Sequence, residues 1–167
     1  IPRGMAGGYT LTPPQEDRRY ESKREILGDI TVCLGGRASE EINLSDITTG
    51  AMRDLEMATQ MARRMVCDYG MSEKLGNVTL GRSHGPIFLG RDMVEEKDYS
   101  EETAKTIDAE IQRIVDACYG RAKKIIHDNQ DKVKLLAQAL MEKEVLGVDQ
   151  ARQLLGIEKK EPPQPPQ

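Results

Sequence analysis

The chain has 167 residues, a formal net charge of −4 and a mean hydropathy of −0.58. This length suits one domain of about 150 residues with a short tail, and no apolar run approaches the ~20 residues that cross a bilayer. The acidic balance, with one Phe, five Tyr and no Trp, argues against a nucleic-acid-binding face, which needs basic and aromatic side chains. The three widely spaced cysteines form neither a disulfide framework nor a Cys-x-x-Cys metal knuckle.

A short strand and a capped helix are expected first along the chain. Residues 1–12 favour extended structure and end at a pair of prolines, so we expect a strand or hairpin arm there. Ser22 and Glu25 have the spacing of a capping box, and apolar residues follow at helical spacing as far as Leu34. The Gly35-Gly36 pair either ends this helix or lets a neighbouring element approach closely.

A second helix is expected from position 49 or 50 to Gly70. Small and apolar residues recur on one of its faces, and glycine commonly follows the last residue of a helix. The stretch 71–93 is rich in glycine and irregular, and residues 78–80 and 87–89 within it are candidate short strands.

The C-terminal half is expected to be helical. A long third helix, capped by Ser100, has apolar residues at steps of three and four, as in helices packed side by side. A short fifth helix runs from Asp149 to Gly156. The sequence thus predicts a mainly α domain over residues 1–157, with a small β element near the N-terminus, and a disordered Pro-rich tail over 158–167. The fourth helix is expected to turn four apolar side chains inward: Val133, Leu136, Leu140 and Met141.

Two charged sites depart from the rule that helical charges face solvent. On the second helix, projection at about 100° per residue places Asp54 at the edge of the apolar face. A buried carboxylate must be compensated by a cation, by hydrogen-bond donors or by a metal ion, and an ion pair is the commonest of these. On the first helix, Arg37 and Glu41 project into the apolar sector and Glu40 lies at its edge, which favours a structural ion pair between Arg37 and Glu41.

A family resemblance changes the weight of these alternatives. It lies in two long blocks, Gly-Gly-Arg-Ala-Ser-Glu-Glu (35–41) and Thr-Thr-Gly-Ala-Met-Arg-Asp-Leu-Glu-Met-Ala-Thr (48–59), and in further blocks at 62–66, 69–76, 88–90, 100–104 and 107–108. At these positions the sequence resembles the peptidase domain of FtsH-type proteases. The resemblance implies a largely helical peptidase domain of a membrane-anchored, ATP-dependent zinc metalloprotease, which forms a homo-hexamer beneath an AAA+ ATPase ring. The implied substrates are unfolded polypeptides and membrane proteins, with no nucleic-acid partner. The implied location is the inner membrane, with the peptidase on its cytoplasmic side, or the organellar equivalent.

The resemblance also implies a zinc site. In this family one Zn²⁺ per subunit is held by the two histidines of a His-Glu-x-x-His motif and by an aspartate of the second helix, which matches Asp54 here. ATP would bind a separate module. Arg37, Glu40 and Glu41 are candidates for orienting the ligands or for a structural role.

The His-Glu-x-x-His motif does not occur in the sequence. The family places it just upstream of Ile1, so we expect both histidines, the general-base glutamate, the ATPase module and the membrane anchor to precede this chain, which alone is expected to be inactive. The strand with Gly8, Tyr9 and Thr10 is a candidate edge for pairing with substrate. The alternative reading is a non-catalytic helical oligomerisation module or degenerate homologue.

Overall fold

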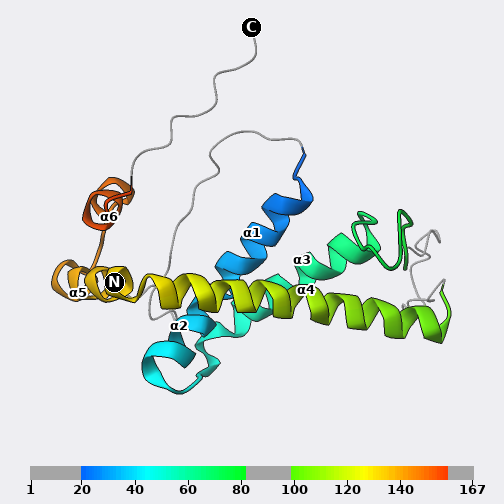
Figure 1. Ribbon diagram of the computed structural model, residues 1–167, viewed down its shortest axis with the longest axis horizontal. Helices are drawn as coiled ribbons and strands as arrows, with labels where there is room; N and C mark the ends of the chain where they lie inside the picture. Colours follow the sequence, from blue (N-terminus) through cyan, green and yellow to red (C-terminus); the bar gives the residue numbers. More distant parts are fainter. Residues whose placement is uncertain (1–19, 82–98, 158–167) are drawn as a thin grey trace, which may run out of the picture. The chain divides into compact units, whose positions relative to one another are not determined.

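The computed structural model describes residues 20–81 and 99–157, which are mainly helical (Figure 1). This confirms the predicted fold class. The described residues fall into two compact units, 20–126 and 127–157, and each is described by itself. None of the described helices combines the length and the apolar character that crossing a membrane requires.

Some sequence predictions lie outside the described residues. These are the N-terminal strand over 1–12, which includes Gly8, Tyr9 and Thr10, the candidate strand at 87–89 and the tail over 158–167. They stay predictions.

Helix α1 (Lys23–Cys33) begins at the predicted capping box. The Glu25 backbone N–H donates to Ser22 Oγ (3.3 Å), and the Ser22 backbone N–H donates to Glu25 Oε2 (2.8 Å). Helix α2 (Gly35–Leu44) follows after an interruption at the buried Leu34. The glycine pair therefore marks a change from one helix to the next.

A single 3₁₀ turn, η1 (Thr49–Ala51), leads into helix α3 (Met52–Cys67). The helix ends before the predicted Gly70 because the backbone N–H of Tyr69 reaches back to Arg64 O (3.0 Å) and breaks the regular helical pattern. Gly70 itself has a φ of +59°, a left-handed conformation that favours glycine.

The candidate strand at residues 78–80 is wrong. Within residues 71–81 the structure has only an isolated antiparallel bridge between Ser72 and Gly76. The Leu80 backbone N–H instead donates to Cys67 O (2.9 Å), at the end of α3. A strand needs a neighbouring strand for its backbone hydrogen bonds, and Leu80 bonds the end of a helix in place of one.

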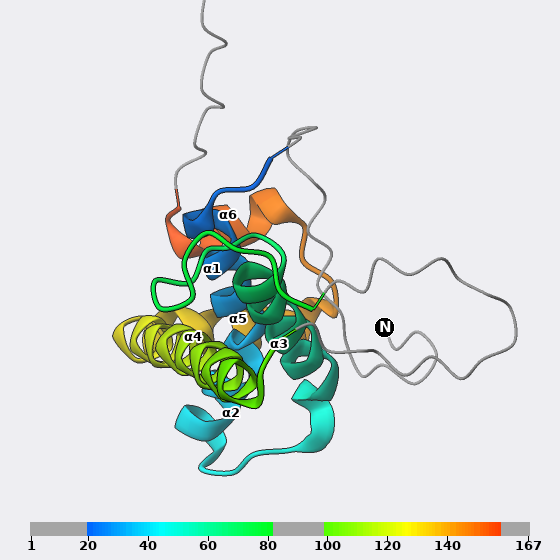
Figure 2. The ribbon, with the colours of Figure 1, turned by 90° about the vertical axis from the view of Figure 1, so that its right-hand side faces the viewer.

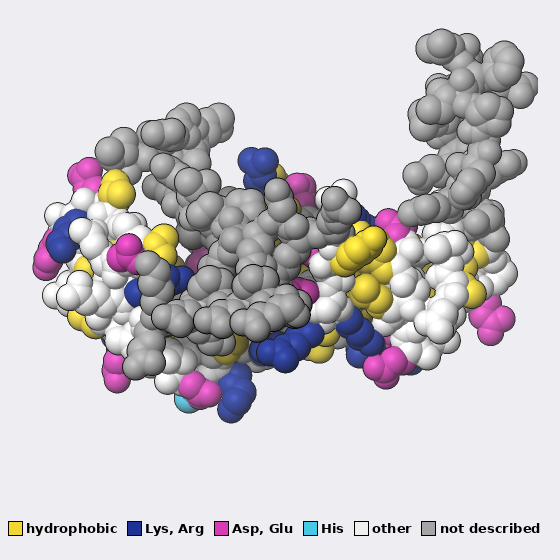
Figure 3. Space-filling model, turned by 90° about the horizontal axis from the view of Figure 1, so that it is seen from above, with side chains coloured by type: hydrophobic (Ala, Val, Ile, Leu, Met, Phe, Trp, Pro, Cys, Tyr) yellow, Lys and Arg dark blue, Asp and Glu magenta, His cyan; other side chains and the backbone are white. Residues whose placement is uncertain are grey.

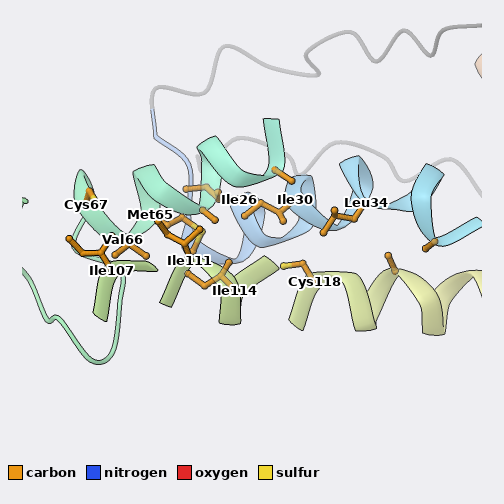
Figure 4. Packing of buried hydrophobic residues seen from close by; sticks show 14 residues of the cluster. Ile26, Ile30, Leu34, Met65, Val66, Cys67, Ile107, Ile111, Ile114 and Cys118 are labelled. Atoms are coloured by element: carbon orange, nitrogen blue, oxygen red, sulfur yellow. The ribbon is translucent and has the colours of Figure 1, made fainter. Parts of the chain in front are cut away.

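The core of residues 20–126 lies where α1, α3 and helix α4 (Glu101–Asp128) come together (Figures 1 and 2). As predicted, Ser100 caps α4, because its Oγ accepts from the Thr103 backbone N–H (3.2 Å). Full burial of each large aliphatic side chain contributes about 1.5–3 kcal/mol. Figure 4 shows the largest of these side chains meeting between the helices: Ile26, Ile30, Leu34, Met65, Val66, Ile107, Ile111 and Ile114.

The second unit contains helices α5 (Gln130–Lys143) and α6 (Val148–Leu155), which contact each other. The prediction that α5 turns four side chains inward is wrong for two of them, since Leu140 is 40% and Met141 85% exposed. Val133 and Leu136 are half-buried. A pair of short helices offers too little facing surface to bury an apolar stripe completely.

The surface carries charges of both signs. On the face shown in Figure 3, Lys and Arg side chains are interspersed with Asp and Glu side chains over the described residues.

Candidate metal site

Asp54 lies in the first turn of α3 and is half-buried. A Cβ atom built on Gly36 would be 3.9 Å from Asp54 Oδ2, so the carboxylate lies against the start of α2. It also lies close enough to Cys33 to raise the pKa of that thiol, although burial of the thiol is the larger cause. Among residues 20–81 and 99–157, the Asp54 carboxylate has no hydrogen-bond or ion-pair partner. An anionic oxygen in this position is available to a cation from outside the described residues.

The chemistry of Asp54 suits one ligand of a zinc ion, since Zn²⁺ accepts carboxylate oxygen beside histidine nitrogen. The described residues bring together no group of three His, Cys, Asp or Glu side chains that could hold a metal. His127 is exposed beside Asp128 (3.4 Å), and His84 lies outside the described residues. A metal at Asp54 would need its further ligands from outside the described residues.

Arg37 and Glu40 of α2 hold Thr48, just ahead of η1. Glu40 Oε1 accepts from the Thr48 hydroxyl (2.6 Å), and Glu40 Oε2 accepts from the Thr48 backbone N–H (3.3 Å). Arg37 Nη1 donates to Thr48 O (3.0 Å) and lies 3.8 Å from Glu40 Oε2. The hydrogen bonds from Thr48 are the main reason that the pKa of Glu40 is lowered. These contacts, which we call the Thr48 clamp, fix the backbone that leads into the helix of Asp54.

Glu41 points to α4 instead. Its carboxylate accepts from Lys123 Nζ (2.6 Å) and from the Tyr119 hydroxyl, and these two hydrogen bonds lower the pKa of Glu41. Burial and then Glu41 raise the pKa of Tyr119 to about 12. The expected pair of Arg37 and Glu41 is therefore replaced, within the described residues, by a pair of Arg37 with Glu40 and one of Lys123 with Glu41.

Sequence analysis missed Glu110, a fully buried carboxylate on α4. It accepts from the Ser72 hydroxyl (2.8 Å) and twice from the Arg113 guanidinium (2.9 and 3.1 Å), and Lys74 Nζ is 3.6 Å away. The Arg113 hydrogen bond is the largest cause that lowers the pKa of Glu110 to about 2. A signal was present, because Glu110 follows the buried Ile107 by three residues on the apolar face.

Comparison with known proteins identifies the family. Residues 1–154 match the model of Peptidase family M41. A protein of Bacillus subtilis (strain 168) named ATP-dependent zinc metalloprotease FtsH is 49% identical over 156 residues, which are 93% of this chain and 24% of the relative. A protein of Halothermothrix orenii with the same name is 53% identical over 144 residues, 86% of this chain and 23% of the relative. The chain thus spans about a quarter of the length of the curated relatives it matches. The chain belongs to peptidase family M41.

Proposed function

We propose that this chain is part of a zinc-dependent endopeptidase and supplies the aspartate ligand, Asp54, of its metal. The observation that carries the proposal is a half-buried carboxylate without a partner among the described residues, in a chain of family M41. The relatives' names, ATP-dependent zinc metalloprotease, support the same chemistry. The two histidines, the general-base glutamate, the ATPase module and the membrane anchor are assigned to polypeptide outside residues 1–167.

In this proposal the chain's own residues bind and orient. When bound, zinc polarises the scissile carbonyl and activates water for attack on it. Asp54 supplies an anionic oxygen ligand from a helix whose first turn is fixed. Arg37 and Glu40 are positioning residues, because the Thr48 clamp holds the backbone just before that turn. Glu41 has a structural role, joining α2 to α4.

The whole protein is proposed to be a homo-hexamer, anchored in the inner membrane or its organellar equivalent, that degrades unfolded polypeptides and membrane proteins with ATP. Support comes from family membership and from the relatives' names. Gly8, Tyr9 and Thr10 are proposed to pair with the substrate backbone by strand addition. Because proline lacks the backbone N–H, Thr10→Pro should lower peptide turnover, and unchanged turnover would contradict that pairing.

The intact mass of the native polypeptide is the first measurement. A mass well above 18.7 kDa leaves room for the remaining ligands, and the following test then uses that complete polypeptide. Zinc content is measured by elemental analysis and activity by hydrolysis of an unfolded protein. We expect Asp54→Asn to lose bound zinc and proteolysis while keeping helicity and ATPase activity.

Asp29→Asn is the matched control, because Asp29 is an exposed carboxylate whose charge also reaches Cys33. It should keep zinc and activity. Glu40→Ala should weaken zinc retention against a chelator less than Asp54→Asn does, because Glu40 holds Thr48, ahead of the helix of Asp54. Full zinc content and proteolysis in Asp54→Asn would remove Asp54 from the ligand set. Zinc-independent assembly without any proteolysis would favour a helical oligomerisation module.

A further inference from the structure

A cavity of about 560 Å³ opens within residues 20–126, between α2, α4 and the start of α3. Its volume lies within the range of about 300–1,000 Å³ that is usual for ligand pockets. Apolar side chains form much of its wall: Leu34, Ile47, Leu55 and Val115. Leu55 directly follows Asp54, so the first turn of α3 contributes both to the candidate metal site and to this cavity.

Two carboxylates on the cavity wall, Asp46 and Asp116, differ from the other charged residues there. Arg37 and Glu41 also line the cavity, but each is already engaged, Arg37 with the Thr48 clamp and Glu41 with α4. Asp46 accepts from the backbone N–H that follows it (2.7 Å), and Asp116 accepts from the amide of Gln112 (2.8 Å). Neither has an ion-pair partner among the residues that the structure describes.

The cavity therefore combines apolar walls with two exposed carboxylates that no cation of the described residues pairs with. Lysine and arginine side chains have matching properties, because their aliphatic stems bury along apolar surface while their charged ends reach polar groups. Asp46 and Asp116 are exposed and solvated, and a cationic side chain has a charge complementarity to them that an anion or an uncharged apolar side chain lacks. Because the cavity opens to solvent, each charged contact adds modestly to affinity.

We propose that this cavity receives an arginine or lysine side chain of an extended polypeptide substrate. The stem would lie against Leu55 and Val115, and the cationic end would lie between Asp46 and Asp116. The identification of the polypeptide as substrate rests on the proposed peptidase function, whereas the binding of the basic side chain does not.

Binding is tested on the full chain without metal. The probes are two blocked tripeptides, Ala-Arg-Ala and Ala-norleucine-Ala, which differ in the charge of the central side chain. We expect the arginine probe to shift the methyl NMR signals of Leu55 and Val115 and to bind more tightly than the norleucine probe. Asp116→Asn and Asp46→Asn should each weaken binding of the arginine probe by about threefold. Asp108→Asn is the matched control, because this exposed carboxylate of α4 does not line the cavity, and it should change nothing.

Equal affinity of the two probes, unshifted Leu55 and Val115 signals, or unchanged arginine binding in both variants would overturn the proposal. In the complete polypeptide, Asp116→Asn should raise KM for an arginine-containing peptide and leave kcat unchanged. If the arginine probe binds and the complete polypeptide cleaves peptides, but Asp116→Asn leaves KM unchanged, the cavity binds basic side chains that do not belong to the substrate. If the complete polypeptide cleaves nothing, the proposed function fails while the binding result stands.

Discussion

Glu110→Gln removes a buried negative charge from α4 with little change in side-chain shape. The carboxylate is surrounded by donors, because Ser72, Lys74 and Arg113 all face it within 2.8–3.6 Å. A glutamine amide replaces one acceptor oxygen by an NH₂ group, which is a donor only. At least one of the facing donors therefore loses its acceptor in the variant.

The size of the effect follows from the exposure of these donors. Glu110 is 0% and Ser72 4% exposed, so water does not replace a hydrogen bond lost between them. Half or more of the Arg113 and Lys74 side chains is exposed, so water solvates these cations. Losing their contacts with Glu110 therefore costs less than losing the Ser72 hydrogen bond. A hydrogen bond to a charged group contributes about 1.5–3 kcal/mol. We expect Glu110→Gln to lower the free energy of unfolding by about 2 kcal/mol at pH 7.

The same substitution has a pH signature. The folded protein holds the pKa of Glu110 at about 2, chiefly through the Arg113 hydrogen bond, whereas an unfolded glutamate has a pKa of about 4.3. The unfolded state therefore binds more protons in this range, and the stabilisation is present above pH 4.3 and is lost as the pH falls toward 2. The glutamine variant lacks this component, so its difference from wild type should shrink on acidification.

Urea unfolding followed by circular dichroism at pH 7 and pH 3 measures both effects. Glu56→Gln is the control, because it makes the same change at an exposed position of α3. It should change stability by less than about 0.5 kcal/mol. Equal destabilisation by the two substitutions at pH 7, or a Glu110→Gln effect that is the same at both pH values, would refute the reasoning.

Two further predictions concern a tight turn and a tyrosine. Gly70→Ala should lower the free energy of unfolding, measured by thermal unfolding, by about 2 kcal/mol or more, because φ is +59° and the new Cβ would lie 3.1 Å from Asn77 Cα. Gly76 has a φ of +74° and no atom within 4 Å of an added Cβ, so Gly76→Ala should lower the free energy of unfolding by about 1 kcal/mol. Equal losses in the two variants would show that the contact at Gly70 relaxes without cost. Since burial and then Glu41 raise the pKa of Tyr119 from 10.0 to about 12, the unfolded state loses this proton first, and stability should fall between about pH 10 and 12. Tyr119→Phe should remove that component of an alkaline unfolding series, and an unchanged pH dependence would contradict it.

Local features of the fold were predictable from sequence because they depend on residues close together in the chain. The capping box of Ser22 and Glu25 and the cap at Ser100 each join residues three apart. The buried stripe of α4 from Ile107 to Cys118 follows from helical spacing. The stripe of α5 failed as a burial prediction because a periodic pattern identifies an apolar face without showing whether another element covers it.

Contacts between distant residues were not predictable in this way. Lys123 and Glu41 are 82 positions apart, and Ser72 and Glu110 are 38 apart. Helical projection gives the direction of each side chain on its own helix and no information on what faces it. The Arg37–Glu41 pair was favoured because it is local, yet α4 brought Glu41 a different partner.

Two carboxylates, Asp54 and Glu110, differ in how far the described fold pairs their charge. Both lie on helix faces that sequence periodicity assigns to apolar packing, and both need compensation for desolvation. Glu110 obtains it from Ser72 and Arg113, so its charge is fully explained by the fold. Asp54 is favoured by the N-terminus of α3 but has no hydrogen-bond or ion-pair partner among the described residues, and the Thr48 clamp fixes the start of its helix. A fixed carboxylate without a partner among the described residues is free to bind a metal, whereas Glu110 is not, and this contrast agrees with the proposed role of Asp54.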